Sequence, residues 1–264
     1  MNKLFATASI AALIAAGGVA AASAAPVFNR IASFPVVQNL PQGSEPDSET
    51  SAEIIAASED GTMLVYSDSP LGAVGFIDIT DPKAPKAGGT VSVDGEPTAV
   101  AVAGGKVLTG VNTSESYTEP SGHLAVIGLE SKAVEATCDV GGQPDSVAVS
   151  PDRLLVAIAI ENERDEDLND GVIPQMPAGN VVIFSLSDGM PDCDSRKLVD
   201  VSGLADIAGS DPEPEFVDIN GENEIVLSMQ ENNHLVVIDG NAGTVKAHFT
   251  AGAVDLAGID VDEE

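Results

Sequence analysis

Short apolar runs separated by turn residues recur along the chain in the same order. A polar start leads into an apolar run that breaks at a Gly, Pro or Asp turn. A second and a third apolar run follow, and a weaker fourth run ends the unit. Because the runs are short and bounded by turns, each unit predicts four β-strands. The units begin with the segments 51–61, 96–105, 143–152 and 213–222, and a fifth begins at 253–262.

The third position of these segments is polar in every copy and sets the period of the repeat. Glu53, Thr98, Asp145, Glu215 and Asp255 occupy it, at intervals of 45, 47, 70 and 40 residues. Four strands in each period of this length are typical of β-propeller blades, whereas a β-sandwich, the alternative, lacks such self-similarity. Insertions at 164–179 and 205–212 account for the long interval, and both are expected to be loops.

The sequence therefore predicts an all-β propeller whose blades lie at 51–95, 96–142, 143–212 and 213–252, after a lead-in at 25–50. Residues 253–264 are expected to form the first strand of a fifth blade. Because an unclosed ring leaves sheet edges exposed, we expect the chain to be part of a larger propeller.

The first 24 residues have the composition of a secretory signal peptide. Lys3 precedes an apolar run from Leu4 to Ala22, and Ala22-Ser23-Ala24 is a small-residue cleavage site. A transmembrane anchor is the alternative, although Ala and Gly make up at least half of the run. We expect a periplasmic or extracellular protein.

The composition limits the partners of the exported chain. There are 42 Asp and Glu against 11 Lys and Arg, a net charge of −31. This charge excludes nucleic acid as a partner and opposes membrane insertion of the mature chain. Hydrophobic residues make up 44%, with no Trp, so the chain can bury a core of Val, Ile, Leu and Ala.

Two cysteines, Cys138 and Cys193, lie 55 residues apart. In an exported protein they can form a disulfide, and closing a loop of this length would stabilise the fold by about 4 kcal/mol. Two independent buried thiols are the alternative. Neither cysteine has the spacing of a metal ligand.

Strand geometry predicts two rings of oxygen-bearing side chains on one face. In up-and-down pairing the first strand of a blade starts, and the second ends, at the same face. One ring consists of the third-position residues Glu53, Thr98, Asp145, Glu215 and Asp255. The other comprises Asp68, Asn112, Glu161 and Glu231, with Asn162 and Asn232 beside the last two. Such oxygens suit Ca²⁺, whereas solvated acids that bind nothing are the alternative.

The inserted segment after Glu161 resembles the start of a calcium loop. Asp165, Asp167 and Asn169 supply oxygens at alternate positions. The segment departs from the EF-hand pattern, because Gly171 is one place late and Met176 stands where Glu is needed. A calcium loop of another kind and an acidic lid both remain open.

Motifs for nucleophilic catalysis are absent from the sequence. There is no Gly-x-Ser-x-Gly and no His-Glu-x-x-His, and His123, His234 and His248 are isolated along the chain. No Lys or Arg is expected near the two rings. Recognition of a phosphate there would consequently depend on a bound metal.

Three stretches carry a family resemblance. They are 142–152, 160–171 with 174–179, and 211–218 with 230–239. In these stretches the chain resembles the N-terminal half of secreted bacterial propeller proteins labelled alkaline phosphatase, esterase-like phytase or choice-of-anchor I. The resemblance implies a longer propeller that continues past Glu264, with acidic residues that hold metal for phosphoester hydrolysis.

Two functions follow as hypotheses. The first is a metal-dependent phosphoester hydrolase, in which Ca²⁺ on the acidic face binds the substrate phosphate and lowers the pKa of a bound water. The second is a non-catalytic periplasmic or surface propeller whose acidic face binds calcium or a partner protein.

Overall fold

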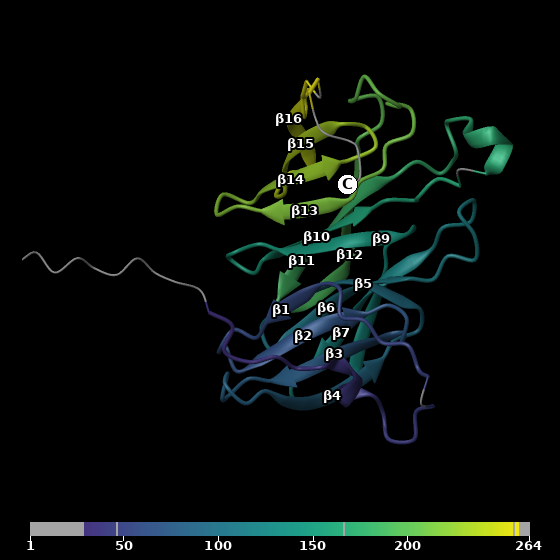
Figure 1. Ribbon diagram of the computed structural model, residues 1–264. Helices are drawn as coiled ribbons and strands as arrows, with labels where there is room; N and C mark the ends of the chain where they lie inside the picture. Colours follow the sequence, from purple (N-terminus) through teal and green to yellow (C-terminus); the bar gives the residue numbers. More distant parts are fainter. Residues whose placement is uncertain (1–28, 46, 166, 256, 259–264) are drawn as a thin grey trace, which may run out of the picture. The chain divides into compact units, whose positions relative to one another are not determined.

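In the part of the chain that the structure describes, the strands form four antiparallel sheets of four strands each. The computed structural model describes residues 29–45, 47–165, 167–255 and 257–258 (Figure 1). Within each sheet the strands follow one another in chain order. The helices in this part of the chain are two 3₁₀ turns, η1 (Val36–Asn39) and η2 (Leu168–Gly171). The all-β prediction is confirmed, while the expected signal peptide lies outside the described residues.

The four sheets are numbered in chain order. Sheet 1 consists of β1 (Ile55–Ala57), β2 (Met63–Asp68), β3 (Ala73–Asp78) and β4 (Lys86–Ser92). Sheet 2 consists of β5 (Glu96–Ala103), β6 (Lys106–Asn112), β7 (Gly122–Gly128) and β8 (Val134–Asp139). Sheet 3 consists of β9 (Pro144–Val149), β10 (Leu155–Ile160), β11 (Asn180–Ser187) and β12 (Met190–Asp200). Sheet 4 consists of β13 (Phe216–Ile219), β14 (Glu224–Met229), β15 (His234–Asp239) and β16 (Thr244–Thr250).

Two segments differ from the expected strands. The weak fourth run of the third unit, 196–201, is expected to be its fourth strand, but β12 begins at Met190, because Asp188 and Gly189 adopt positive φ and make a two-residue hairpin turn. Residues 253–255 and 257–258, where a fifth repeat was expected to begin, form no strand, and 259–264 lie outside the described residues. The described residues of the insertions at 164–179 and 205–212 form no strand, as expected for loops.

The core lies between the faces of consecutive sheets. Side chains alternate along a strand, so a sheet with a neighbour on each side must be apolar on both faces. β10 meets this condition over its whole length: Val156 and Ile158 pack toward sheet 2, whereas Ala157 and Ala159 pack toward sheet 4. A third apolar cluster joins sheets 1 and 2.

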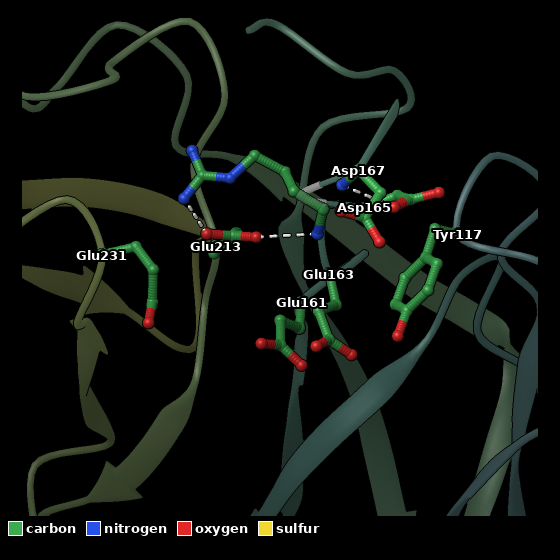
Figure 2. Close-up of a pocket in the computed structure, with 8 residues that line it drawn as sticks. Tyr117, Glu161, Glu163, Asp165, Asp167, Glu213 and Glu231 are labelled. Atoms are coloured by element: carbon green, nitrogen blue, oxygen red, sulfur yellow. Dashed lines mark hydrogen bonds and ion pairs between the residues drawn. The ribbon is translucent and has the colours of Figure 1, made fainter. Parts of the chain in front are cut away.

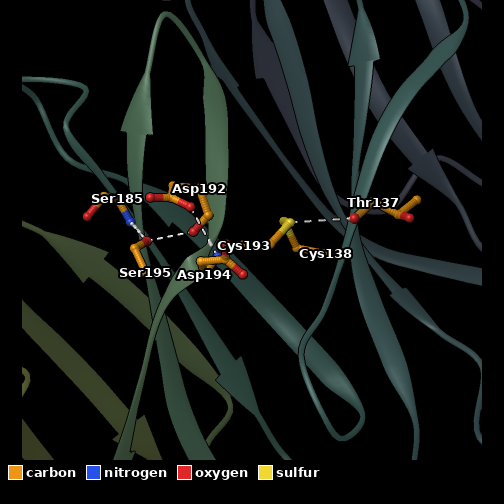
Figure 3. The surroundings of a disulfide bond; sticks show 7 residues. All are labelled: Thr137, Cys138, Ser185, Asp192, Cys193, Asp194 and Ser195. Atoms are coloured by element: carbon orange, nitrogen blue, oxygen red, sulfur yellow. Dashed lines mark hydrogen bonds between the residues drawn. A yellow bond between two sulfur atoms is a disulfide. The ribbon is translucent and has the colours of Figure 1, made fainter.

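A disulfide links sheets 2 and 3. Cys138 on β8 and Cys193 on β12 are bonded, and their Cα atoms lie 5.3 Å apart (Figure 3). The bond closes a loop of 55 residues that contains most of sheet 3. It thus fixes one sheet-to-sheet contact covalently, in addition to the apolar packing.

We predict that replacing both cysteines by Ala lowers the free energy of unfolding by about 2–4 kcal/mol, because the unfolded chain regains the entropy of the closed loop. Urea unfolding of the oxidised protein and of the double variant measures the difference. Reduction of the native protein should produce the same loss, and an unchanged urea midpoint in both samples would contradict the prediction.

Candidate functional site

Two neighbouring acidic pockets lie at strand ends, and side chains next to strands of all four sheets line them. The first has a volume of about 400 Å³ (Figure 2), and its lining comprises Tyr117, Glu161, Glu163, Arg164, Asp165, Asp167, Glu213 and Glu231. The second has a volume of about 530 Å³, and acidic side chains in its lining are Glu53, Glu96, Asp145, Glu161 and Glu163. Tyr117, Glu161 and Glu163 belong to both pockets.

The pairing of β9 with β10 positions the central acids. Glu161 follows β10 directly, and its backbone N–H donates to the carbonyl of Gln143 at 2.9 Å. Asp145 is the second residue of β9. A register shift at Ala159 and Ile160 redirects the end of β10. The two carboxylates therefore meet at one end of sheet 3, as the repeat predicts.

Asparagines beside the acids hold the backbone of their own repeat. The Asn162 Oδ1 accepts the N–H of Gln143 at 3.0 Å, and the Asn232 Oδ1 accepts the N–H of Glu213 at 3.0 Å. Both asparagines are buried. Their side-chain oxygens fix the start of a first strand, so they are engaged in structure and do not belong to a ring of ligands.

Asp68 plays the same part in the first repeat and is not in the pocket lining. Its Oδ1 accepts the N–H of Ser51 at 2.9 Å, and its Oδ2 accepts a hydrogen bond from the hydroxyl of Thr50. The side chain is fully buried. The expectation that Asp68 joins Glu161 and Glu231 in a second ring is wrong, because strand-end polar groups of this kind satisfy backbone donors.

An ion pair crosses the first pocket. The guanidinium of Arg164 pairs with the carboxylate of Glu213, which also accepts the backbone N–H of Arg164 at 2.8 Å (Figure 2). Glu213 is almost completely buried. The expectation that no basic residue lies near the acids is therefore wrong. The pair ties the loop after β10 to the segment that precedes β13.

Burial and the repulsion between neighbouring negative charges raise the pKa values of the central carboxyl groups. Burial, followed by the charges of Asp145, Glu215 and Glu163, raises the pKa of Glu161 to about 9. Burial, followed by the charge of Glu163, raises the pKa of Asp145 to about 6. At neutral pH the free protein thus keeps a proton on Glu161.

A second pair of acids belongs to sheet 4. Burial, a hydrogen bond with Glu231 and the charge of Glu231 raise the pKa of Glu215 to about 8. Burial acts in the same direction on Glu231, but hydrogen bonds with Glu215, its own backbone and Gln230, together with the charge of Arg164, outweigh burial and lower the pKa of Glu231. Glu215 consequently holds the proton, and Glu231 carries the negative charge.

The remaining predicted residues separate into two groups. Glu53, Thr98 and Asn112 line the second pocket, where the hydroxyl of Ser69 donates to Glu53 at 2.7 Å, and Asp165 and Asp167 line the first. Asn169 and Asp255 are exposed and do not line either pocket. The repeat thus brings together Asp145, Glu161, Glu215 and Glu231, and it does not bring Asp68, Asn169 or Asp255 to them.

Four residues of the first pocket were missed by the sequence analysis: Tyr117, Glu163, Arg164 and Glu213. Glu213 is the first residue of the segment 213–222, as Gln143 is of 143–152, so the alignment of the repeats could have placed it at the same strand ends. Tyr117 lies in the β6–β7 hairpin loop and Arg164 in the insertion, where the repeat gives no register.

The pockets are acidic without forming a closed metal centre. In the part of the chain that the structure describes, no three His, Cys, Asp or Glu side chains are grouped so as to hold one ion. Outside the pockets, the expectation of isolated histidines is wrong for one pair, because the Nε2 of His234 and the Nδ1 of His248 lie 2.9 Å apart.

We predict that Arg164→Met destabilises the protein by about 3–5 kcal/mol, because it leaves the Glu213 carboxylate buried without its partner. Arg164→Met combined with Glu213→Gln should recover most of the loss, since the remaining side chain is neutral. Chemical denaturation of the three proteins measures this, and a double variant as unstable as the single one would argue against the ion pair as the cause.

We predict that the protein loses stability as the pH rises toward 9. The pKa of Glu161 and that of Glu215 are raised to about 9 and about 8, whereas an unfolded Glu has a pKa near 4.3. The folded state therefore binds more protons between these values, and its stabilisation is complete below about pH 4.3 and lost as the pH rises through 8–9.

Glu161→Gln should flatten this decline, because the amide stays neutral throughout. Thermal unfolding between pH 5 and pH 9 measures the slope, and Glu130→Gln, at an exposed acid outside both pockets, is the control. Equal slopes in the wild type and in Glu161→Gln would show that Glu161 ionises normally.

Comparison with known proteins identifies the family of the chain. The described residues contain no helix that is long and apolar enough to cross a membrane. No curated protein matches the chain significantly. The family described as choice-of-anchor I domain matches residues 53–264, which include all four sheets. The chain therefore belongs to the choice-of-anchor I domain family.

Proposed function

We propose that this domain is a non-catalytic binding module of an exported protein and that its acidic pockets bind cations, with Ca²⁺ as the first candidate. Membership of the choice-of-anchor I family indicates a secreted or cell-surface protein. Export through cleavage of residues 1–24 is the finer part of the proposal. One observation supports cation binding: the half-buried carboxyl groups of Asp145 and Glu161, which line the pockets, and of Glu215, whose charge acts on Glu161, have raised pKa values.

In the free pockets, protons neutralise carboxyl groups that a bound cation would neutralise more effectively. Glu161 and Glu215 are protonated at neutral pH because of burial and neighbouring negative charge. A bound cation removes that repulsion and lowers both pKa values, so binding is coupled to the release of protons. Arg164 does not compete for this role, because Glu213 already neutralises it.

The donor chemistry fits Ca²⁺ better than it fits a softer metal. Carboxylate oxygens are the ligands that Ca²⁺ prefers, and neither pocket lining contains a His or Cys. The described acids are not gathered around one point, so affinity in the range of extracellular modules, about 10⁻⁴–10⁻³ M, is expected. The pockets are also large enough for an amine or for a basic side chain of a partner protein.

We also propose that the four sheets are consecutive blades of a β-propeller. Each sheet has the same strand order, and apolar clusters join sheet 1 to 2, 2 to 3 and 3 to 4. In this arrangement the pockets lie at the blade ends that face the axis.

A metal-dependent phosphoester hydrolase is the second candidate, and the family resemblance of the inserted loop supports it. The pairing of Arg164 with Glu213 weighs against it, because the phosphate would then be held by metal alone. Calcium-dependent hydrolysis of an aryl phosphate would favour this candidate, and its absence in a protein that binds Ca²⁺ would favour the binding module.

We predict that Glu161→Gln with Glu215→Gln weakens Ca²⁺ binding at least about tenfold, a loss of roughly 1.4 kcal/mol, because an amide cannot release a proton to give the cation a charged ligand. Glu130→Gln with Asp192→Asn removes the same number of carboxyl groups at exposed positions outside both pockets and is the control. Calorimetric titration measures both.

The same titration in buffers of different ionisation enthalpy reports proton release. At pH 7 the wild type should release protons on binding Ca²⁺, and the Glu161→Gln, Glu215→Gln variant should not. Equal affinity losses in the two double variants, or calcium binding without proton release, would leave only diffuse attraction to an acidic surface.

A further inference from the structure

Two histidines of sheet 4 lie in contact outside the acidic pockets. His234 is the first residue of β15, and His248 lies on β16 (Figure 1). The Nε2 of His234 and the Nδ1 of His248 are 2.9 Å apart, and the centroids of the two rings are 5.2 Å apart. Neither residue lines the two acidic pockets. The pair therefore has no part in the calcium binding proposed above.

Strand register places both rings on the face of sheet 4 that is turned toward sheet 3. Val236 comes two residues after His234 on β15, and it is paired with His248 on β16. Side chains two residues apart on a strand share a face, so both histidines are on the face of Val236. Val236 belongs to the apolar cluster that sheet 4 shares with sheet 3. A further repeat would pack on the opposite face and would leave this site unchanged.

The two rings differ in their freedom to move. His234 is only 7% exposed, so the packing around it fixes the position of its ring. His248 is exposed and lies on β16, which is an edge strand of sheet 4. One nitrogen is thus held in place by the fold, and the other can adjust its position at little cost.

The contact between the rings places two metal-binding nitrogens face to face. In a hydrogen bond between neutral imidazoles one nitrogen donates and the other accepts. When the shared proton moves to the other nitrogen of its own ring, both facing nitrogens present a lone pair. Bonds of about 2.0–2.1 Å at a tetrahedral angle put two ligand nitrogens about 3.3 Å apart. The pair must therefore open by about 0.4 Å, which the exposed ring of His248 permits.

We propose that His234 and His248 bind a divalent transition-metal ion such as Zn²⁺ or Cu²⁺ and that water completes its coordination. Imidazole nitrogen is a ligand of these ions, whereas Ca²⁺ takes oxygen ligands, so this site and the acidic pockets select different metals. Among the described residues, no third His, Cys, Asp or Glu is grouped with the pair to hold an ion. The affinity is consequently lower than that of a four-ligand structural zinc site.

The charge around the pair favours a metal ion over a second proton. Burial and the neighbouring His248 lower the pKa of His234, so that its ring is neutral at pH 7 and available as a ligand. The negative charge of Asp206, in the loop after β12, acts on His234 in the opposite direction and attracts a cation. A metal ion thus meets a neutral ligand pair beside a carboxylate.

Calorimetric titration of the untagged chain with Zn²⁺ tests the proposal at about pH 7.5, above the ordinary His pKa of about 6.5. About 5 mM CaCl₂ is present throughout to compete for the acidic pockets. The wild type should bind Zn²⁺, and His248→Gln should weaken this binding at least about tenfold, because a nitrogen ligand is lost. His123→Gln is the matched control, because His123 lies on β7 of sheet 2, and it should leave the affinity unchanged.

Electron paramagnetic resonance of Cu²⁺ identifies the ligands. The wild type should show coupling of Cu²⁺ to two nitrogens, and His234→Gln and His248→Gln should each show coupling to one. Urea unfolding without metal confirms that each variant is folded. Absence of Zn²⁺ binding, unchanged affinity in His248→Gln, an equal loss in His123→Gln, or Cu²⁺ bound by oxygen alone would overturn the proposal. The Glu161→Gln, Glu215→Gln variant should keep the two-nitrogen spectrum, so the calcium and histidine sites are tested independently.

Discussion

The packing of one sheet face against the next is the constraint on which the structure depends. Sheets 2 and 3 have a neighbour on both sides, so nearly every position within their central strands must be apolar, and β6 and β10 are buried almost throughout. Polar side chains are thereby confined to strand ends and loops. The acidic pockets follow from this confinement, because the acids of several repeats are displaced to the same end of their sheets.

The strand content followed from the sequence because a single chemical rule governs it. Apolar runs of matched length, broken by Gly, Pro or Asp, recur in all four units. A strand that is ambiguous in one unit is therefore identified by its counterparts in the others. The extension of β12 was missed, although Asp188-Gly189 is a dipeptide typical of hairpin turns. That turn has no counterpart in the other units, so the repeat could not predict it.

The site was only partly accessible to the same reasoning. Asp145, Glu161, Glu215 and Glu231 occupy repeated positions, and strand geometry sufficed to bring them together. Arg164 contacts Glu213, which lies 49 residues further along the chain. Because Arg164 lies in an insertion, the repeat could not predict this contact. The roles of Asn162, Asn232 and Asp68 were hidden for another reason. Whether a strand-end oxygen faces a pocket or a backbone N–H depends on the local turn, not on its place in the repeat.

Because Glu161 and Glu163 belong to the lining of both pockets, the two cavities share two carboxyl groups. A positive charge that entered either cavity would interact with these two groups, which would then attract a second positive charge in the other cavity less strongly. By thermodynamic linkage the effect would be reciprocal, so the first occupant would lower the affinity for the second. Cations bound in the two cavities would therefore show negative cooperativity, and the shared carboxyl groups would be its cause.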